Sequence, residues 1–538
     1  MRRAALVPVL AIATLFTFVP GVAAIGPGGW DHAGHGATST TASLNGAVYA
    51  LNADDPGVLL VGGNFTSAGG VANASRIATW NGTAWGALNG TPISNGAVFA
   101  IAYHAGKVYA GGTFQNAGGN ADADFLAVWD GSGWAPFCNP TLPKPSFGGN
   151  VMALQVIDNT LYVGGAFANG AGIAAADYLL ACDLTTGASS ATVPNSDDIS
   201  GAVYALTADS NGTLYAGGGF INVVGIPAAD HIAAYDGTWH AMGSGPTLAG
   251  GGAVEGFVRG LAAHGTDVYI GTDVVNVAGI ANADHVVKWD GAAWSAVGAN
   301  AAGTDGWFPA STFINALTTV GPMVFAAGSF QNANGVATAD NIAYFDGATW
   351  RPIGSNGAGN GPYIGNTTAL AVFRSKVYAS GNFTSAGGDT WAVSLAAYAL
   401  MLPDARIGTA SAGPFTGNAI YSSSAAGESR TQFVSRSHSV TFYVNVQNDG
   451  LVAAAFTFKG TGSARGYSVR YYRGATNVTT AVKAGTWSTG AIAARSSITL
   501  KVVVTRASSS ASSATYLVKA MSVSGTPSDA VKAIAKAK

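Results

Sequence analysis

Residues 203–242 read VYALTADSNGTLYAGGGFINVVGIPAADHIAAYDGTWHAM, and the fold prediction depends on this stretch. It holds four short apolar runs, which are Val203–Leu206, Leu214–Phe220, Ile232–Tyr235 and Trp239–Met242. Gly, Asn or Asp residues bound the runs, as they commonly bound β-strands. The Asp-Gly pair at 236–237 favours the tight primed turn of a hairpin between the last two runs. The stretch is therefore predicted to be a four-stranded antiparallel meander.

The same unit recurs seven times between residues 46 and 400. Its marker is a pair of small residues, usually Gly-Gly, followed two places later by a large apolar residue. Gly doublets of this kind suit positions that need positive φ or a close approach of two backbones. The large apolar residue is found at Phe65, Phe114, Phe167, Phe220, Val274, Phe330 and Phe383. A period near fifty built from short strands is typical of a β-propeller, and seven units predict seven blades.

The seventh unit stops after its third run, Ser394–Leu400. The start of the mature chain, Gly29-Trp30-Asp31, resembles the beginning of a fourth run. Trp30 is therefore predicted to supply the last strand of the last blade and to close the ring, which removes exposed sheet edges. The other repeated tryptophans are predicted to fill the wedge between blades rather than to stack on a ligand.

Five aspartates recur directly before the third run of a unit, at Asp124, Asp177, Asp230, Asp284 and Asp340. A side chain that recurs in five units is predicted to anchor a loop by accepting hydrogen bonds from backbone N–H groups. A calcium role is the alternative, because oxygen-rich loops suit that ion.

The first 24 residues are typical of a secretory signal, with Arg2 and Arg3, an apolar run over 5–19, and small residues at 22–24. The apolar run is shorter than the ~20 residues that a membrane-spanning helix needs. The mature chain is predicted to be secreted or held at the cell surface, with no transmembrane segment after cleavage. Cys138 and Cys182 form either one disulfide or two separate thiols in such a protein, and the sequence leaves both open.

From Pro403 the fifty-residue repeat ends and the charge turns basic. Residues 403–538 hold 15 Lys and Arg against 4 Asp and Glu, a net of +11, whereas residues 25–402 hold 8 against 23, a net of −15. Short alternating runs such as Val440–Val446 predict an immunoglobulin-like β-sandwich over 403–525. Residues 526–538 are predicted to be a basic tail. The basic part suits an anionic cell-wall polymer, although the excess charge could also serve solubility alone.

The Gly-Gly pairs, the Trp-Asp-Gly turns at 129–131 and 289–291, and the Trp that follows each turn resemble bacterial secreted Kelch-type propellers. The propeller of fungal cortical marker proteins has a similar pattern. This resemblance implies the fold over 25–402 and says little about function. Copper radical oxidases of the Kelch-type class need two Tyr, two His and a Cys bonded to one Tyr. That set cannot be assembled here, so no cofactor is carried over.

The chain offers no recognisable catalytic group. Only two glutamates occur, Glu255 and Glu428, where a glycosidase usually needs two facing carboxylates. The sequence contains neither a phosphate-binding loop nor a Gly-x-Ser-x-Gly elbow. His32 and His35 are spaced as a metal pair can be, but two histidines alone indicate plain hydrogen bonding more often. The acidic propeller also disfavours nucleic acid. No catalytic, cofactor-binding or metal-binding residue is assigned.

The preferred hypothesis is an extracellular or cell-surface binding or scaffold protein whose propeller rim recognises a carbohydrate or a protein. Long connections between the fourth strand of one blade and the first strand of the next all lie on this rim. The ligand-binding candidates in these connections are Phe147, Phe257, Asp305, Trp307, Phe308 and Tyr363. The alternative is a propeller enzyme that acts on an extracellular polysaccharide, with Asp305 or Asp273 and a nearby histidine. Asp273 attracts attention because the fifth unit departs from the repeat there.

Overall fold

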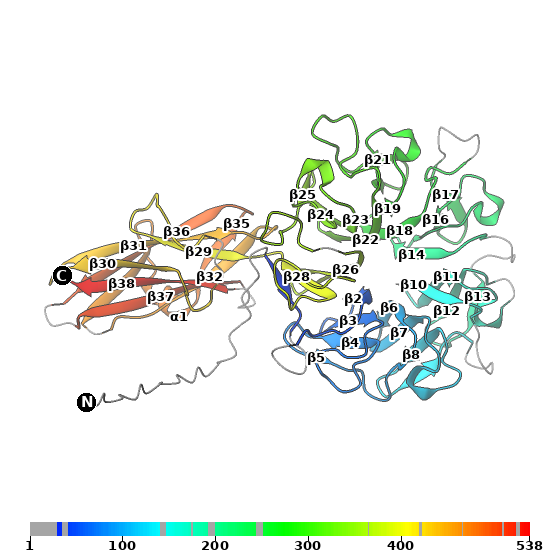
Figure 1. Ribbon diagram of the computed structural model, residues 1–538, viewed down its shortest axis with the longest axis horizontal. Coiled ribbons are helices and arrows are strands. Elements are labelled where there is room, and N and C mark those ends of the chain that lie inside the picture. The colour runs from blue at the N-terminus through cyan, green and yellow to red at the C-terminus, as the bar shows by residue number, and fades with distance from the viewer. Residues whose placement is uncertain are drawn as a thin grey trace, which may run out of the picture.

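The computed structural model describes residues 29–34, 41–139, 147–173, 176–191, 199–243, 251–363, 365–418, 422–464, 466–507, 511–522 and 528–538. The predicted signal segment, 1–24, lies outside the described residues, as does His35. The fold is all-β (Figure 1). Seven antiparallel sheets of four strands form a ring, and two sheets of five strands form a C-terminal module.

The seven sheets of the ring follow the chain, so that each unit of the sequence repeat is one sheet. Sheets one to three are β2 (Val48–Asn52), β3 (Leu59–Gly63), β4 (Ile77–Trp80), β5 (Trp85–Gly86); β6 (Val98–His104), β7 (Lys107–Gly112), β8 (Leu126–Trp129), β9 (Trp134–Pro136); and β10 (Asn150–Ile157), β11 (Thr160–Ala166), β12 (Leu179–Asp183), β13 (Ser189–Ala191). Sheets four and five are β14 (Val203–Ala208), β15 (Leu214–Gly218), β16 (Ile232–Tyr235), β17 (Trp239–Ala241); and β18 (Val258–His264), β19 (Asp267–Thr272), β20 (Val286–Trp289), β21 (Trp294–Ala296). Sheets six and seven are β22 (Phe313–Val320), β23 (Met323–Ser329), β24 (Ile342–Phe345), β25 (Trp350–Pro352); and β26 (Thr367–Phe373), β27 (Lys376–Gly381), β28 (Leu395–Ala399), β1 (Trp30–His32).

The first strands of the sheets form the inside of the ring. Strand β2 contacts β6, β6 contacts β10, and the series continues through β14, β18, β22 and β26 back to β2. Between the second and third strands of sheets two to six lies a short 3-10 helix. These helices are η1 (Ala117–Gly119), η2 (Gly170–Gly172), η3 (Val223–Gly225), η4 (Val277–Gly279) and η5 (Ala333–Gly335).

Strand β1 closes the ring, as the sequence predicts. It pairs antiparallel with β28, and Trp30 lies opposite Tyr398. The Trp30 side chain is fully buried, its indole N–H donates to the carbonyl of Ile353 at 3.1 Å, and its ring meets those of Tyr363 and Tyr398 edge-on at 5.8 and 5.5 Å. Residues from the two ends of the ring therefore share one sheet without a covalent link between them.

The repeated tryptophans join neighbouring sheets, which supports the prediction that they are core residues. The indole N–H of Trp350 donates to the Val297 carbonyl at 2.5 Å, and that of Trp294 donates to the Met242 carbonyl. Each acceptor directly follows the last strand of the preceding sheet. The bond from Trp30 to Ile353 has the same form, so one contact type joins sheet four to sheet five, sheet five to sheet six, and sheet six to the closing strand of sheet seven.

The five repeated aspartates accept backbone hydrogen bonds, as predicted. Each carboxylate takes the N–H of an Asn eight residues earlier at 2.6–2.7 Å, directly before the 3-10 helix. Three of them take a second N–H from the connection to the next sheet: Gly252 donates to Asp230, Gly306 to Asp284 and Gly361 to Asp340. One side chain thus fixes two loops. Cys138 and Cys182 are bonded to one another, with Cα atoms 5.5 Å apart, and join sheets two and three.

The C-terminal module is two five-stranded sheets around a shared apolar core. One sheet has the order β29 (Pro403–Gly408), β31 (Ser439–Asn448), β36 (Ser497–Arg506), β33 (Tyr467–Arg473), β34 (Thr476–Asn477). The other has the order β30 (Ser429–Val434), β38 (Ser528–Ala537), β37 (Ser513–Ser522), β32 (Ala454–Gly460), β35 (Trp487–Ile492). The short helix α1 is Thr479–Ala484. Within the described residues, no helix has both the length and the apolar character to cross a bilayer.

The predicted basic tail is wrong for residues 528–537. These residues form β38, which lies between β37 (antiparallel) and β30 (parallel) inside the second sheet. Buried and solvent-facing residues alternate along this strand. Val531, Ala533 and Ala535 point into the core, while Lys532 and Lys536 point away from it. Small apolar residues between lysines suit a strand with one solvated face, and the prediction gave too much weight to the charge.

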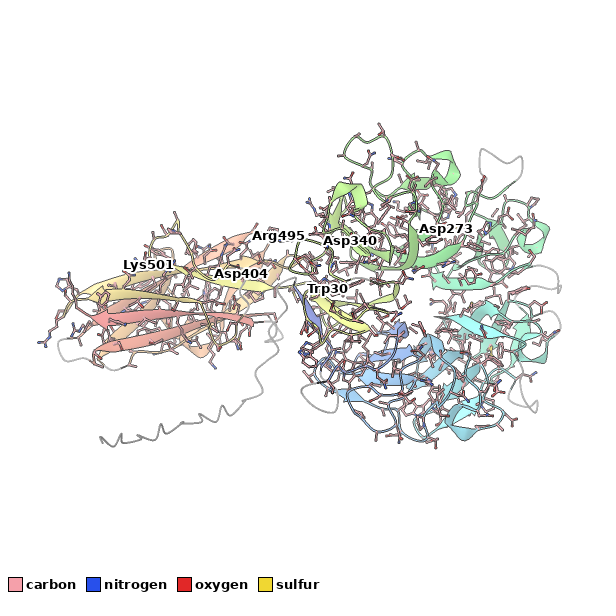
Figure 2. All side chains as sticks on the ribbon, viewed as in Figure 1. Trp30, Asp273, Asp340, Asp404, Arg495 and Lys501 are labelled. Carbon is pink, nitrogen blue, oxygen red and sulfur yellow. A yellow bond between two sulfur atoms is a disulfide. The ribbon has the colours of Figure 1, made fainter. Side chains whose placement is uncertain are left out.

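The ring and the module meet without a long linker. The carbonyl of Leu400 accepts the N–H groups of Leu451 and Val452, and the N–H of Asp449 donates to the Leu402 carbonyl. Arg495 of the module hydrogen-bonds the Tyr344 hydroxyl of sheet six. Figure 2 shows Trp30 on the side of the ring nearest the module. Lys501 lies within the module, far from the ring.

Three acidic side chains, Asp404, Glu428 and Asp529, are fully buried in the module. Burial raises the pKa of Asp529 to about 7, although the hydrogen bonds that it accepts from the N–H groups of Ala405, Ser422 and Ala530 favour its ionised form. Glu428 accepts no hydrogen bond at either oxygen. Burial, together with the charges of Asp529 and Asp404, raises the pKa of Glu428 from 4.5 to about 9, so this side chain is neutral at pH 7.

Replacement of Trp30 by Ala should destabilise the ring by ~3–5 kcal/mol, the usual effect of truncating a buried Trp. The ring should then open between β1 and β28, and a protease should cleave the freed N-terminal residues first. Thermal denaturation and limited proteolysis measure both effects. The half-exposed Trp129→Ala, in a sheet of four consecutive strands, is the control. A Trp30→Ala chain that melts and is cleaved like wild type would contradict this role.

The Glu428→Gln variant should be more stable than wild type at pH 8. A folded-state pKa above the unfolded value means that the folded chain holds a proton which the unfolded chain releases, so stability falls as the pH rises from about 4.5 towards 9. Glutamine is neutral at every pH and removes that loss. Melting temperatures of both chains between pH 4.5 and 9 measure the effect, and parallel pH profiles would contradict it.

Candidate ligand-binding face of the ring

Every sheet of the ring has a β-bulge near the beginning of its first strand. In each of the seven strand pairs the register skips one residue of the first strand, which is the second residue of the strand in five sheets and the third in sheets three and six. The skipped residues, called the bulge residues below, are Tyr49, Phe99, Met152, Tyr204, Arg259, Asn315 and Thr368. A bulge bends the strand and re-aims the side chain of the extra residue.

The marker glycines allow a close backbone contact beside these bulges. A Cβ on the second glycine of the pair would lie 1.8–2.1 Å from the carbonyl oxygen of the residue two places before the bulge residue, in six of the seven sheets. For Gly63 that oxygen belongs to Ala47, and for Gly218 to Ala202. The first glycine makes room for the next sheet instead, since a Cβ on Gly217 would lie 2.4 Å from Val258. The second glycine accompanies the bulge in six sheets, and the fifth sheet has the same bulge with Thr272 at that place.

A cavity of about 190 Å³ lies on the ring axis and is lined by the first strands of all seven sheets. Six of the seven bulge residues line it, and Met152 is the exception. Most of the remaining wall is Ala, Leu, Ile and Gly backbone and side chain. Because the bulges stand at one end of the first strands, the larger and more varied side chains gather at the same end of the cavity.

The bulge residues divide into an aromatic group and a polar group. Tyr49 and Phe99 meet edge-on at 5.3 Å, and the Tyr49 hydroxyl accepts a hydrogen bond from Asn64 at 3.0 Å. Asn315 donates to the Thr367 carbonyl at 3.1 Å, and Thr368 donates to the Val48 carbonyl at 2.6 Å, which ties sheet seven to sheet one. These contacts thus fix the orientations of the Tyr49, Phe99, Asn315 and Thr368 side chains.

Arg259 differs from the other six bulge residues because it is charged. Within the described part of the chain it is the one charged residue that lines the cavity. Its guanidinium carbon lies 5.6 Å from the Phe257 ring centre and 5.7 Å from that of Phe313, which are cation–π distances. Both phenylalanines are unusually exposed, at 41% and 40%. Phe257 also packs against Tyr204 at 6.1 Å and His231 at 6.4 Å.

Four of the six residues predicted to bind a ligand are buried and cannot do so. Phe147, Trp307, Phe308 and Tyr363 lie in the core of the sheets. Phe147 packs on Phe167 at 5.0 Å, Phe308 on Phe330 at 5.0 Å, and Tyr363 on Phe383 at 4.6 Å. Each of these partners is a marker residue of the repeat. The long connections to sheets three, six and seven therefore fold inward and pack an aromatic ring against the end of the sheet, a packing role that loop composition does not reveal.

Phe257 and Asp305 are the two candidates that remain exposed. Asp305 lies in the connection to sheet six, and it accepts the N–H of Gly306, which also donates to Asp284. Burial, followed by the hydrogen bond and charge of Asp305, raises the pKa of Asp284 above its usual value. Neither aspartate lines the axial cavity. Of the predicted set, only Phe257 stands beside the bulge residues.

The residues named for the enzyme alternative do not meet at the cavity. Asp273 lies near His285, but the imidazole is fully buried, and that burial lowers the pKa of His285. Both this histidine and His231 occupy a structural position, directly before the third strand, where every sheet has a residue with φ of 59–64°. Asp273, Asp305 and His285 are all absent from the described lining of the cavity, so no pair of facing carboxylates exists there.

One cluster of metal-ligand types exists within the described residues, formed by Asp31, His32 and Asp389. His32 hydrogen-bonds Asp389 at 2.5 Å, and Lys376 donates to Asp31 at 3.2 Å. Burial alone would lower the pKa of His32, but the hydrogen bond and charge of Asp389 outweigh it and raise that pKa. These contacts tie β1 to sheet seven, so the cluster serves ring closure.

Comparison with known proteins adds no relative. The chain matches no described protein family and no curated protein. Among solved structures, the secreted serine protease VesC from Vibrio cholerae is 14% identical, over 20% of this chain and 21% of VesC, with a TM-score of 0.15. The N-terminal domain of PorA is 13% identical, over 25% of this chain and 97% of that domain, with a TM-score of 0.17. The VesB protease of Vibrio cholerae is 10% identical, over 52% of this chain and 90% of VesB, with a TM-score of 0.15. Likenesses this small do not bear on the fold or the function.

Replacement of Gly218 by Ala should destabilise the ring by ~1–3 kcal/mol, because the new Cβ would clash with the Ala202 carbonyl of the bulge. Gly133→Ala is the matched control, since a Cβ there meets nothing within 4 Å. Chemical denaturation of both variants measures the difference. Equal stability of the two variants would show that the bulge does not require glycine.

Proposed function

We propose that the ring is a seven-bladed β-propeller of the secreted Kelch type and that the C-terminal module is an immunoglobulin-like sandwich. The seven four-stranded sheets, the closed circle of first strands and the closure by β1 support the propeller. The sheet boundary between Ala399 and Pro403 supports a domain boundary at 402/403, and β38 extends the sandwich to the last residues. The net charges of the two parts, −15 and +11, fit two different partners.

The function that the geometry supports best is recognition of an extracellular carbohydrate by the bulge end of the axial cavity. One observation carries this proposal: each of the seven sheets has a bulge, and six of the seven bulge residues place unlike side chains around one cavity. A repeat whose backbone is constant while its bulge residue varies suits recognition, because the scaffold stays rigid as the contacts change. Half-exposed aromatic rings, with a few fixed polar groups, are what a sugar-binding site needs for stacking and hydrogen bonding.

The enzyme alternative has less support. Hydrolysis of a glycosidic bond usually requires two carboxylates on either side of it. Within the described residues, the axial cavity has none. We therefore propose a binding protein, exported through the signal over 1–24 and secreted or attached to the cell surface. The basic sandwich is proposed to hold it on an anionic cell-wall polymer, with Lys501 and Arg470 among the cations that β36 and β33 carry.

A glycan array tests the function, with the mature chain as the probe and a parallel assay for sugar release. Binding without release is the expected result. Release that Asp305→Asn or Asp273→Asn abolishes would favour the enzyme instead. Failure to bind any glycan on the array would overturn the proposal.

Phe257→Ala should reduce glycan affinity about tenfold or more, as the loss of an aromatic hot spot does, and should change stability little because the ring is already exposed. Phe308→Ala should show the opposite pattern, since a buried Phe costs ~3–5 kcal/mol. Affinity and melting temperature are measured on both variants. A Phe257→Ala chain with wild-type affinity would exclude this part of the face.

A further inference from the structure

The fifth sheet departs from the repeat at one end only, and that end faces the bulge residues. Four positions change there: Thr272 stands where the other six sheets have the second glycine, Asp273 and Val274 follow it, and Arg259 is the bulge residue. In the six other sheets a carbonyl oxygen lies 1.8–2.1 Å from where the Cβ of that glycine would be. Thr272 carries a Cβ at this place, and the sheet keeps the same bulge, with Val258 opposite Thr272. The side chain of Phe257, two residues before the bulge residue, is 41% exposed.

Within the described structure, the positive charge of Arg259 is not balanced by a carboxylate. No described carboxylate forms an ion pair with Arg259. Phe257 and Phe313 lie at cation–π distance from its guanidinium carbon. Stacking on an aromatic face leaves the N–H edge of a guanidinium available, and that edge matches the two oxygens of a carboxylate.

We propose that the axial site binds an acidic carbohydrate, with the carboxylate of a uronic-acid-type sugar on Arg259 and the sugar ring among Tyr204, Phe257 and Phe313. This inference rests on the proposed function and names its ligand class. The cavity of about 190 Å³ is smaller than the ~300–1,000 Å³ of pockets for drug-sized molecules, so it admits one sugar-sized group rather than a folded segment.

The charge of the rest of the ring restricts the ligand further. Residues 25–402 have a net charge of −15, which repels a densely charged polymer. The single cation of the cavity wall accepts one carboxylate. The ligand that fits both facts is a glycan in which an acidic sugar alternates with neutral ones, or ends a neutral chain. Nucleic acids and polyuronates, with one negative charge on every unit, fit less well.

Isothermal titration of the mature full chain with two matched disaccharides tests the inference. The probes are a glucuronosyl-glucose and the corresponding glucosyl-glucose, which differ by one carboxylate. Wild type should bind the acidic disaccharide about tenfold or more tightly than the neutral one, because charge-assisted hydrogen bonds are among the stronger contacts. Arg259→Gln should remove that preference, because it weakens binding of the acidic disaccharide far more than binding of the neutral one.

Arg374→Gln is the matched control. Arg374 also lies over a phenylalanine ring, Phe373, at 5.1 Å, but at the far end of β26 and outside the cavity. It should keep the wild-type preference for the acidic sugar. Melting temperatures of both variants establish that they are folded.

Each other outcome decides against the inference in a different way. Equal affinity for the two disaccharides, or an acidic preference that persists in Arg259→Gln, would overturn the acidic-sugar assignment and leave glycan binding intact. Binding of an acidic peptide through Arg259, with no binding of either disaccharide, would overturn the sugar assignment in favour of a protein ligand. Failure to bind these disaccharides and every glycan on the array would overturn the proposed function as well.

Discussion

In six of the seven sheets a backbone carbonyl occupies the space that a side chain would take on the second marker glycine. This close contact accompanies the bulge of the first strand in those six sheets, and the fifth sheet has the same bulge with Thr272 at that place. A bulge adds twist and turns one side chain out of the regular alternation. The neighbouring first glycine lets the next sheet approach to contact distance, as Gly217 does for Val258. The marker pair therefore lies where the bulge forms and where neighbouring sheets pack.

A rigid frame follows from this constraint and from two recurring polar contacts. The indole N–H of a tryptophan bonds a carbonyl of the preceding sheet, and an aspartate carboxylate holds both the 3-10 helix and the following connection. All three devices act through the backbone, so they tolerate variation at other positions. The bulge residue is such a position, because its side chain leaves the sheet. Variation from Tyr49 to Arg259 to Thr368 therefore costs the fold little and changes what the axial site can bind.

Charged side chains have different roles in the ring and in the C-terminal module. In the ring, most aspartates accept backbone hydrogen bonds at turns, and the axial wall carries one cation and no acid within the described residues. In the C-terminal module, Glu428 and Asp529 are buried together, and the module keeps one of them neutral. Apart from the buried Arg506, the lysines and arginines of the described strands are partly or fully exposed, so most of the excess positive charge lies at the surface.

The sequence by itself determined the parts of the fold that arise from local chemistry and repetition. The period near fifty, the Asp-Gly turns and the Gly pairs predicted four-stranded units, and the truncated seventh unit predicted that Trp30 pairs with the last sheet. Only the tertiary structure decided which loop aromatics are exposed. Phe147, Trp307, Phe308 and Tyr363 look as suitable as Phe257 in sequence, but each packs among core aromatic rings, and burial depends on how a connection folds back. The prediction of a basic tail was wrong for a related reason, because β38 pairs with β37 and with β30, and β30 is distant in the sequence. The sequence did not predict the bulge residues either, because a strand register depends on the pairing of two segments and neither segment determines it alone.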